Sequence, residues 1–142
     1  MSVVQTLKIL HASAKTFTFE MQKYHWMVKG KNFYDLHRAF EELYNWGFAQ
    51  EDEFAERLLI IGSEPVLSQE EVKEFNRINV LAKADLVENK MVFNVKAALE
   101  ILLATAREGL ETVGDDVGTD SLLNDFIADV EKRLWMLNAY VA

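Results

Sequence analysis

Residues 25–61 read HWMVKGKNFYDLHRAFEELYNWGFAQEDEFAERLLII, and this stretch determines how the rest of the chain can fold. Residues 30–32 interrupt a helical pattern, and Asn32 is placed to cap a new helix. That helix carries a core stripe at helical spacing, made of Leu36, Phe40, Leu43, Gly47, Phe54, Leu58 and Ile61. Residues 62–65 close it. The pattern therefore predicts one long, unbroken helix after a short loop.

The same helix has a second apolar face. When Leu36 is set at 0° and each residue advances about 100°, four further apolar residues fall between about 80° and 140°: Tyr44, Phe48, Ala55 and Leu59. Packing inside the chain needs only one face, so the second is expected to be buried in an isologous contact with another subunit. Gly47 either lets two backbones approach at that contact or is simply tolerated in the helix.

Four side chains on or near this face have the chemistry of metal ligands: His25, His37, Asp52 and Glu56. With a rise of about 1.5 Å per residue, His37 and Asp52 lie roughly 22 Å apart on one helix, so a single ion cannot bind both within one molecule. Antiparallel packing of two helices about a two-fold axis near Tyr44 would place His37 opposite Asp52 of the partner subunit. Spacing alone also allows the alternative that these side chains are solvated or serve structural hydrogen bonds.

The remaining histidine is expected to be structural. His11 lies two heptads before His25, and no matching carboxylate accompanies it. A metal site inside a four-helix bundle would need a Glu three residues before a His on two helices. The residues three positions before the histidines are instead Lys8, Gln22 and Tyr34. We therefore expect no such intramolecular site.

Apolar residues spaced by four and three predict a first helix from about Ser2 to Val28. After residue 65, Ser68 and Glu71 can form a capping box for a short helix through Phe75. Antiparallel neighbours need only a short loop, so this longer link predicts a crossover between parallel helices.

A third long helix is predicted to begin near Asp85, where Glu88 completes a capping box, and to end at Gly114 and Gly118. The fourth covers residues 119–140. Four long helices with one long crossover predict an all-α, ferritin-like four-helix bundle with a short helix in the crossover between helices two and three. We expect all 142 residues to form a single ferritin-like domain.

Composition narrows the class of function. The chain has no cysteine, which excludes disulfides, thiolate metal sites and iron–sulfur clusters. Its net charge of −8 serves solubility, cation attraction or both, and it has no basic run for nucleic acid. No signal pattern begins the chain and no apolar stretch is long enough for a membrane span. We therefore expect a cytoplasmic protein without a membrane partner.

The segments HWMVKGKNFYDLH (25–37) and DEFAERLLIIGSEP (52–65) resemble the signature of the Dps family of miniferritins. DDVGTDSLL (115–123) and EKRLWMLNAYV (131–141) are similar to that family's last loop and helix, so the resemblance covers nearly the whole chain. It implies a dodecamer built from two-fold dimers, with ferroxidase centres at the two-fold interfaces. These centres would oxidise Fe(II) with hydrogen peroxide or oxygen, and the shell would store ferric iron and protect against oxidative damage.

The resemblance also implies roles for individual residues. By motif position, His25 and His37 correspond to iron ligands of one subunit, and Asp52 and Glu56 to those of its mate. Glu41 matches a position often occupied by Asp that can add a ligand, and the reach of its longer side chain is open.

Further positions depart from the family pattern or carry two interpretations. Arg38 stands where many members have Glu, which is expected to weaken a second iron position. Trp26 either intercepts stray oxidising equivalents or packs in the core or an interface. Four acidic residues near the last loop either line a three-fold pore or cap helices on a solvated surface: Asp115, Asp116, Asp120 and Asp125.

Two alternative functions remain at this point. Some Dps proteins compact DNA with basic tails, but this chain shows no such tail, and DNA binding is not expected. In the other alternative, the protein forms a non-redox shell whose histidines and carboxylates bind zinc or nothing. Measuring iron oxidation distinguishes this shell from a ferroxidase.

Overall fold

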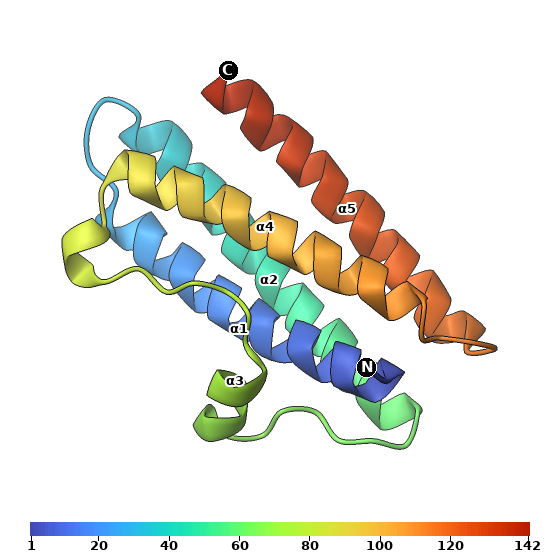
Figure 1. The fold of residues 1–142 in the computed structure, drawn as a ribbon. Coiled ribbons are helices and arrows are strands. Elements are labelled where there is room, and N and C mark those ends of the chain that lie inside the picture. The colour runs from blue at the N-terminus through green and yellow to red at the C-terminus, as the bar shows by residue number, and fades with distance from the viewer.

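The computed structural model describes all 142 residues and contains helices but no strands. Its elements are α1 (Val3–Met27), α2 (Phe33–Ile60), α3 (Gln69–Phe75), the 3₁₀ helix η1 (Lys83–Asp85), α4 (Glu88–Leu110) and α5 (Val117–Val141). The four long helices form a bundle, and α3 lies beside it in the link from α2 to α4 (Figure 1). The predicted all-α bundle with a short crossover helix is confirmed.

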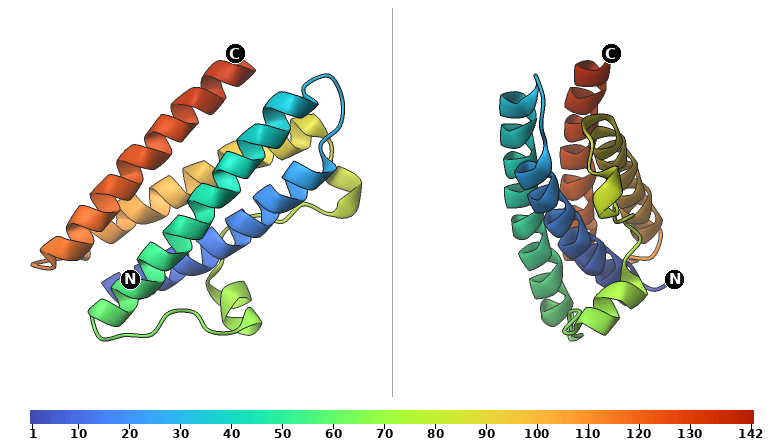
Figure 2. Two further views of the ribbon diagram at one scale, coloured as in Figure 1. Left: turned by 180° about the vertical axis from the view of Figure 1, so that it is seen from behind. Right: turned by 90° about the vertical axis from the view of Figure 1, so that its left-hand side faces the viewer.

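Two antiparallel hairpins make up the bundle. Residues 28–32 join α1 to α2, and residues 111–116 join α4 to α5. The long link over residues 61–87 returns the chain to the end where α2 began, so α2 and α4 run in the same direction (Figures 1 and 2). The predicted crossover between parallel helices is therefore confirmed.

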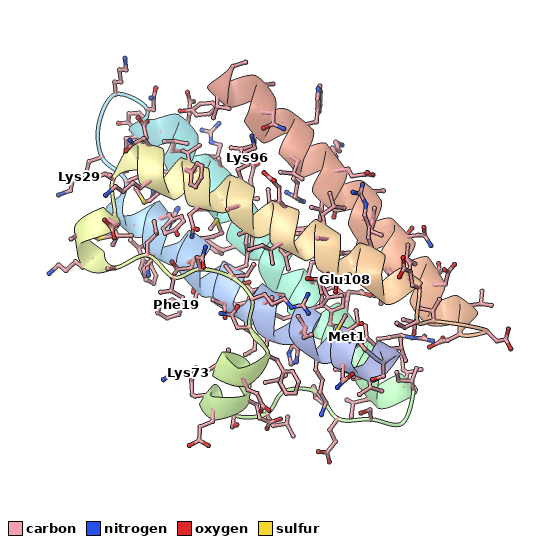
Figure 3. The ribbon with its side chains drawn as sticks, viewed as in Figure 1. Met1, Phe19, Lys29, Lys73, Lys96 and Glu108 are labelled. Atoms are coloured by element: carbon pink, nitrogen blue, oxygen red, sulfur yellow. The ribbon has the colours of Figure 1, made fainter.

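The hydrophobic core lies between the inner faces of the four long helices. Its largest fully buried side chains include Phe17, Tyr24, Phe40 and Phe54. Trp46 is also buried, although it lies outside the predicted core stripe of α2. Some apolar side chains, such as that of Phe19 in α1, project from the surface of the bundle (Figure 3). None of the helices has the length and apolar character required to cross a membrane.

Side chains cap the starts of α1 and α3, and the cap at Ser68 was predicted from the sequence. The Ser2 hydroxyl accepts a hydrogen bond from the Gln5 backbone N–H at 3.1 Å, and the Gln5 side chain accepts one from the Ser2 N–H at 2.9 Å. The Ser68 hydroxyl accepts the Glu71 N–H at the start of α3, at 3.1 Å. At both starts, the serine hydroxyl accepts a hydrogen bond from a backbone N–H that has no partner within the helix.

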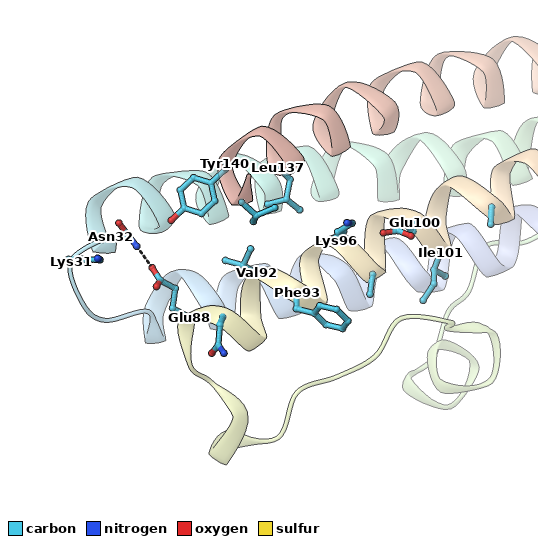
Figure 4. A pocket seen from close by; sticks show the side chains of 14 residues that line it. Lys31, Asn32, Glu88, Val92, Phe93, Lys96, Glu100, Ile101, Leu137 and Tyr140 are labelled. Atoms are coloured by element: carbon cyan, nitrogen blue, oxygen red, sulfur yellow. Dashed lines mark hydrogen bonds between the residues drawn. The ribbon is translucent and has the colours of Figure 1, made fainter.

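The predicted capping of α2 and α4 is wrong. Asn32 precedes α2, but its side-chain amide donates to Glu88 at 2.7 Å instead of capping the helix (Figure 4). Asp85 does not cap α4 either, since it lies in η1 and pairs with Lys90 at 2.9 Å. Other side-chain partners have therefore taken over the groups that local rules assign to capping, a distant one for Asn32 and a nearby one for Asp85.

Gly118 lies inside α5 and does not mark the end of the preceding helix. Asp116 caps α5 by accepting the Thr119 N–H at 3.0 Å. A side chain at position 118 would collide with the guanidinium of Arg57. The glycine therefore makes room for a contact between α2 and α5, while Gly114, with φ of 53°, occupies the loop as expected.

Gly47 lies where α2 passes close to α1. A side chain at this position would overlap the Thr18 hydroxyl, crowd the Thr18 Cβ and touch the ring of Phe17. The interpretation that Gly47 opens the contact between two subunits is wrong, because its missing side chain faces a helix of the same chain. Gly47 instead sets how closely the first hairpin packs.

We expect Gly47→Ala to lower the free energy of unfolding by about 1–3 kcal/mol through overpacking. This loss should appear even though alanine favours a helix by about 1 kcal/mol over glycine. Adding Thr18→Ala removes the obstructing hydroxyl and should recover most of the loss, with Thr18→Ala alone as the control. Denaturant unfolding measures the three variants, and an equal loss with and without Thr18 would contradict this account.

Candidate metal centre

The loop over residues 28–32 places His25, at the end of α1, beside His37, near the start of α2. The two rings stack with centroids 3.7 Å apart and planes 16° apart. His25 Nδ1 lies 2.7 Å from the His37 carbonyl oxygen, and His37 Nδ1 lies 2.8 Å from the His25 carbonyl oxygen. The structure thus brings together the two histidines that the sequence singled out.

These reciprocal hydrogen bonds determine which ring nitrogen can bind a metal. A carbonyl oxygen can only accept, so Nδ1 of each histidine must donate and carry a proton. In a neutral imidazole this leaves the Nε2 lone pair free, which is the arrangement that metal-binding histidines adopt. Phe33 stacks on His37 at 4.8 Å and Tyr44 meets His25 edge-on at 5.3 Å. Neither aromatic support was predicted from the sequence, although Phe33 lies four residues before His37 and so shares its face.

Glu41 extends one side of the histidine pair. Its Oε1 lies 3.8 Å from His25 Nε2, and half of its side-chain surface is exposed. The longer side chain therefore does reach the nitrogen that is free to bind a metal. A role for Glu41 as a further ligand stays a prediction.

Asp52 and Glu56 form a separate pair near the other end of α2. Both are exposed, and neither forms a hydrogen bond or ion pair within the chain. Because α2 is unbroken, its rise places Asp52 roughly 22 Å from His37. No three His, Asp or Glu side chains of one chain lie close enough together to hold a metal ion. The four candidate ligands are thus divided into a histidine half-site and a carboxylate half-site.

Neighbouring charges leave the carboxylate half-site negative. Lys15 Nζ binds Glu51 at 2.9 Å, and Arg57 Nη2 donates to Asp116 at 2.8 Å. These two cations lie next to the half-site in space or in sequence but are engaged by other acids. The carboxylates of the half-site therefore remain available to a cation.

The second apolar face of α2 is uncovered within the chain. Phe48 is 47% exposed and Leu59 is 58% exposed, while Tyr44 and Ala55 are half-buried. Tyr44 and Phe48 lie between the two half-sites along α2, while Ala55 and Leu59 lie beside the carboxylates. Trp26 is 63% exposed, so a core role for it is wrong, and its interface and oxidation roles stay predictions.

Asp116 caps α5. Helix capping was one of the two roles considered for this residue, and the other was to line a pore. Hydrogen bonds from the Thr119 hydroxyl and backbone N–H, with a smaller effect of Arg57, hold the pKa of the Asp116 carboxyl below its usual value. Asp120 lies in the first turn of α5 but does not cap the helix. The pore role stays a prediction for Asp115, Asp120 and Asp125.

The largest groove of the chain does not involve the candidate ligands. It has a volume of about 1080 Å³ and lies between α4 and the end of α5, beside the loop before α2 (Figure 4). Its walls include Val92, Phe93, Lys96, Leu137 and Tyr140. None of the predicted metal ligands lines it.

His11 has the structural role predicted for it. It is buried, and its Nδ1 accepts the Val66 N–H at 3.1 Å, which ties the crossover to α1. Burial, and then the charge of Lys15, lower the pKa of His11 to about 4, against a smaller opposing effect of Asp52. His11 is therefore neutral at pH 7 and carries its proton on Nε2.

The protein should lose stability between pH 6.5 and pH 4. In this range the unfolded chain binds a proton at His11, whose ordinary pKa is 6.5, and the folded chain does not. Stability therefore falls as the pH is lowered, by roughly 3 kcal/mol across the full range. His11→Asn keeps an acceptor for Val66 but cannot titrate, so it should remove this part of the acid sensitivity. Denaturant unfolding at pH 7 and pH 4 measures the difference, and an unchanged pH dependence in the variant would refute it.

Comparison with known proteins assigns the class. A family model for the ferritin-like domain matches residues 7–142. The DNA protection during starvation protein 2 of Bacillus anthracis is 34% identical over 141 residues, which cover 98% of this chain and 96% of that protein. The DNA protection during starvation protein of Helicobacter pylori is 31% identical over 146 residues and the match covers both chains completely. The bundle is therefore a ferritin-like domain.

Solved structures agree with this assignment. Dps from Vibrio cholerae O1, described as a member of a broad superfamily of ferritin-like diiron-carboxylate proteins, is 32% identical with a TM-score of 0.93, and the match covers 99% of this chain and 89% of that one. Dps from Staphylococcus aureus is 31% identical with a TM-score of 0.92, at coverages of 99% and 95%. The chain belongs to the Dps family, as residues 25–37 and 52–65 had indicated.

Proposed function

We propose that the protein is an iron-oxidising and iron-storing shell protein whose metal centres are each built by two subunits. His25 and His37 of one subunit bind iron together with Asp52 and Glu56 of the partner subunit. The observation that carries this proposal is the arrangement along α2, where a histidine half-site and a carboxylate half-site lie at opposite ends of one uncovered apolar face.

A two-fold axis joins the half-sites. The midpoint between positions 37 and 52 falls at Tyr44 and Asn45. Antiparallel packing of α2 about an axis at this point places each free Nε2 opposite carboxylates of the partner subunit. The same contact covers Phe48 and Leu59, and symmetry makes two equal centres per dimer. We propose that six such dimers form a dodecameric shell.

The ligand set is suited to the oxidation of Fe(II), which is the substrate. Imidazole nitrogen and carboxylate oxygen both bind Fe(II), and the anionic carboxylates stabilise Fe(III) more strongly. This difference lowers the reduction potential of the bound iron and favours oxidation. Two Fe(II) ions each give one electron to hydrogen peroxide, whose O–O bond breaks, and two protons complete two water molecules. No hydroxyl radical is released, and oxygen can serve as an alternative oxidant.

The comparisons support iron as the substrate at the level of the family, since the related Vibrio cholerae protein is described as a diiron-carboxylate protein. Glu41 is proposed as a further ligand because its carboxylate lies beside His25 Nε2. Arg38 is exposed next to His37 and adds a positive charge, which disfavours a second cation. DNA association is not proposed, because a net charge of −8 repels the phosphate backbone.

Hydrogen peroxide added to anaerobic, Fe(II)-loaded protein should produce ferric absorbance much faster than in protein-free solution. One peroxide should be consumed for every two Fe(II). The variant His25→Ala/His37→Ala should lose the acceleration, because it lacks the nitrogen ligands, and circular dichroism checks that it still folds. Stopped-flow absorbance follows the reaction. If the wild-type protein binds metal without accelerating oxidation, the non-redox shell is the better account.

Mixing experiments test whether the centre is shared between subunits. His25→Ala/His37→Ala and Asp52→Ala/Glu56→Ala should each be inactive alone. A mixed dimer has one centre with all four ligands and one with none, so complete random exchange should restore about a quarter of the wild-type activity. Native mass spectrometry counts the mixed dimers. The shared-site proposal fails if verified mixed dimers remain inactive.

A further inference from the structure

A buried phenol and carboxylate lie one turn apart on α1, next to the histidine half-site. Tyr24 has no exposed surface, and Glu20 is 1% exposed. The Tyr24 hydroxyl donates to Glu20 Oε1 at 3.1 Å and accepts from the Asn94 amide at 2.7 Å. The proposed iron chemistry gives neither residue a role.

Polar partners surround the Glu20 carboxylate inside the bundle. Its Oε1 also accepts the Leu81 backbone N–H at 2.8 Å, and its Oε2 lies 2.6 Å from Lys23 Nζ. Partners of this kind offset the cost of burying a carboxylate. The Tyr24 hydroxyl donates its hydrogen to Glu20, so the phenol carries its proton in this arrangement. The pair is therefore a protonated phenol that points at a buried base.

This pairing makes Tyr24 an accessible electron source. A phenol that loses an electron becomes a strong acid, and its proton can pass along the existing hydrogen bond to Glu20. The products are a neutral phenoxyl radical and a neutral carboxylic acid, so oxidation creates no new buried charge. The bundle also shields the radical, because the ring is fully buried and packs edge-on against Phe40 at 5.6 Å.

Tyr24 is also adjacent to the proposed iron site. It directly precedes His25, and the Cα atoms of neighbouring residues are about 3.8 Å apart. An electron that moves from the phenol to iron held by His25 can therefore follow a continuous covalent path through the backbone of these two residues.

We propose that Tyr24 donates one electron to the reaction at the proposed iron site, with Glu20 as the acceptor of its proton. This inference rests on the proposed function and extends it. It applies when a centre holds a single iron, which the positive charge of Arg38 favours. Hydrogen peroxide then takes one electron from Fe(II) and the second from Tyr24.

The step is balanced in atoms and electrons. The O–O bond of hydrogen peroxide breaks, two electrons and two solvent protons convert it to two water molecules, Fe(II) becomes Fe(III), and the Tyr24 proton moves to Glu20. A second Fe(II) later reduces the radical, and Glu20 returns the proton to Tyr24. Two Fe(II) are thus oxidised for each peroxide although only one iron occupies the centre at a time.

The test uses the assembled protein loaded anaerobically with less than one Fe(II) per proposed centre and then mixed with one peroxide per iron. Samples frozen within milliseconds are examined by electron paramagnetic resonance. Wild-type protein should show a transient tyrosyl signal that narrows when the protein is made with ring-deuterated tyrosine. Tyr24→Phe keeps the ring against Phe40 but should lose the signal completely.

Two further variants separate this role from a structural one. Glu20→Gln keeps an oxygen for the Leu81 N–H but removes the base, so the radical should form roughly 10²-fold more slowly. Tyr140→Phe changes a tyrosine near the end of α5 and should leave the signal intact. A spin trap should capture at least twofold more hydroxyl radical from Tyr24→Phe than from the wild type. A purely structural network would alter unfolding in the variants without altering these radical readouts.

The outcomes distinguish the two proposals. If the wild type accelerates iron oxidation but shows no tyrosyl signal, or if Tyr24→Phe keeps the signal, the role of Tyr24 is refuted and the proposed function stands. If the wild type does not accelerate oxidation at all, the proposed function fails, and the inference about Tyr24 fails with it.

Discussion

The reciprocal hydrogen bonds between His25 and His37 join the end of α1 to the start of α2. Each imidazole uses Nδ1 to bind the backbone carbonyl of the other, so the bonds that close the hairpin also orient both Nε2 atoms for a metal. Gly30, with φ of 110°, allows the tight loop between them. The contacts that hold the first hairpin together are therefore the same contacts that orient the two histidine ligands.

The rigidity of α2 determines what lies beyond these histidines. A continuous helix cannot fold back to bring Asp52 to His37, and the fold supplies no other carboxylate cluster within the chain. The cations nearest the carboxylate half-site are held by Glu51 and Asp116. A second subunit is then the simplest source of the missing ligands, and the uncovered apolar face of α2 supplies the contact area. In this proposal, assembly and iron binding depend on the same helix.

Hydrophobic periodicity was enough to predict the four long helices, the crossover and the two faces of α2, because burial follows helical spacing closely. Contacts that cross the fold were not predictable in this way. Asn32 binds Glu88 although 56 positions separate them, and Gly118 accommodates Arg57 from another helix. Spacing placed Gly47 correctly in the core stripe but could not show that α1 lies against it. The candidate ligands were identified from residue type and spacing. The tautomer of the two histidines could be assigned only from the structure, which shows the partners of Nδ1.

Stability alone does not explain the buried network around Glu20. A buried charge with its partners is often no more stabilising than apolar residues of the same volume. Tyr24, Glu20 and Asn94 nevertheless occupy buried positions, where Leu or Phe would pack without a desolvation cost. The network also tethers residue 81 of the crossover, because Lys23 donates to the Leu81 carbonyl and Glu20 accepts the Leu81 N–H, but neither bond requires a phenol beside it. Proton-coupled oxidation does require a phenol and a base in contact, and it accounts for both groups at once.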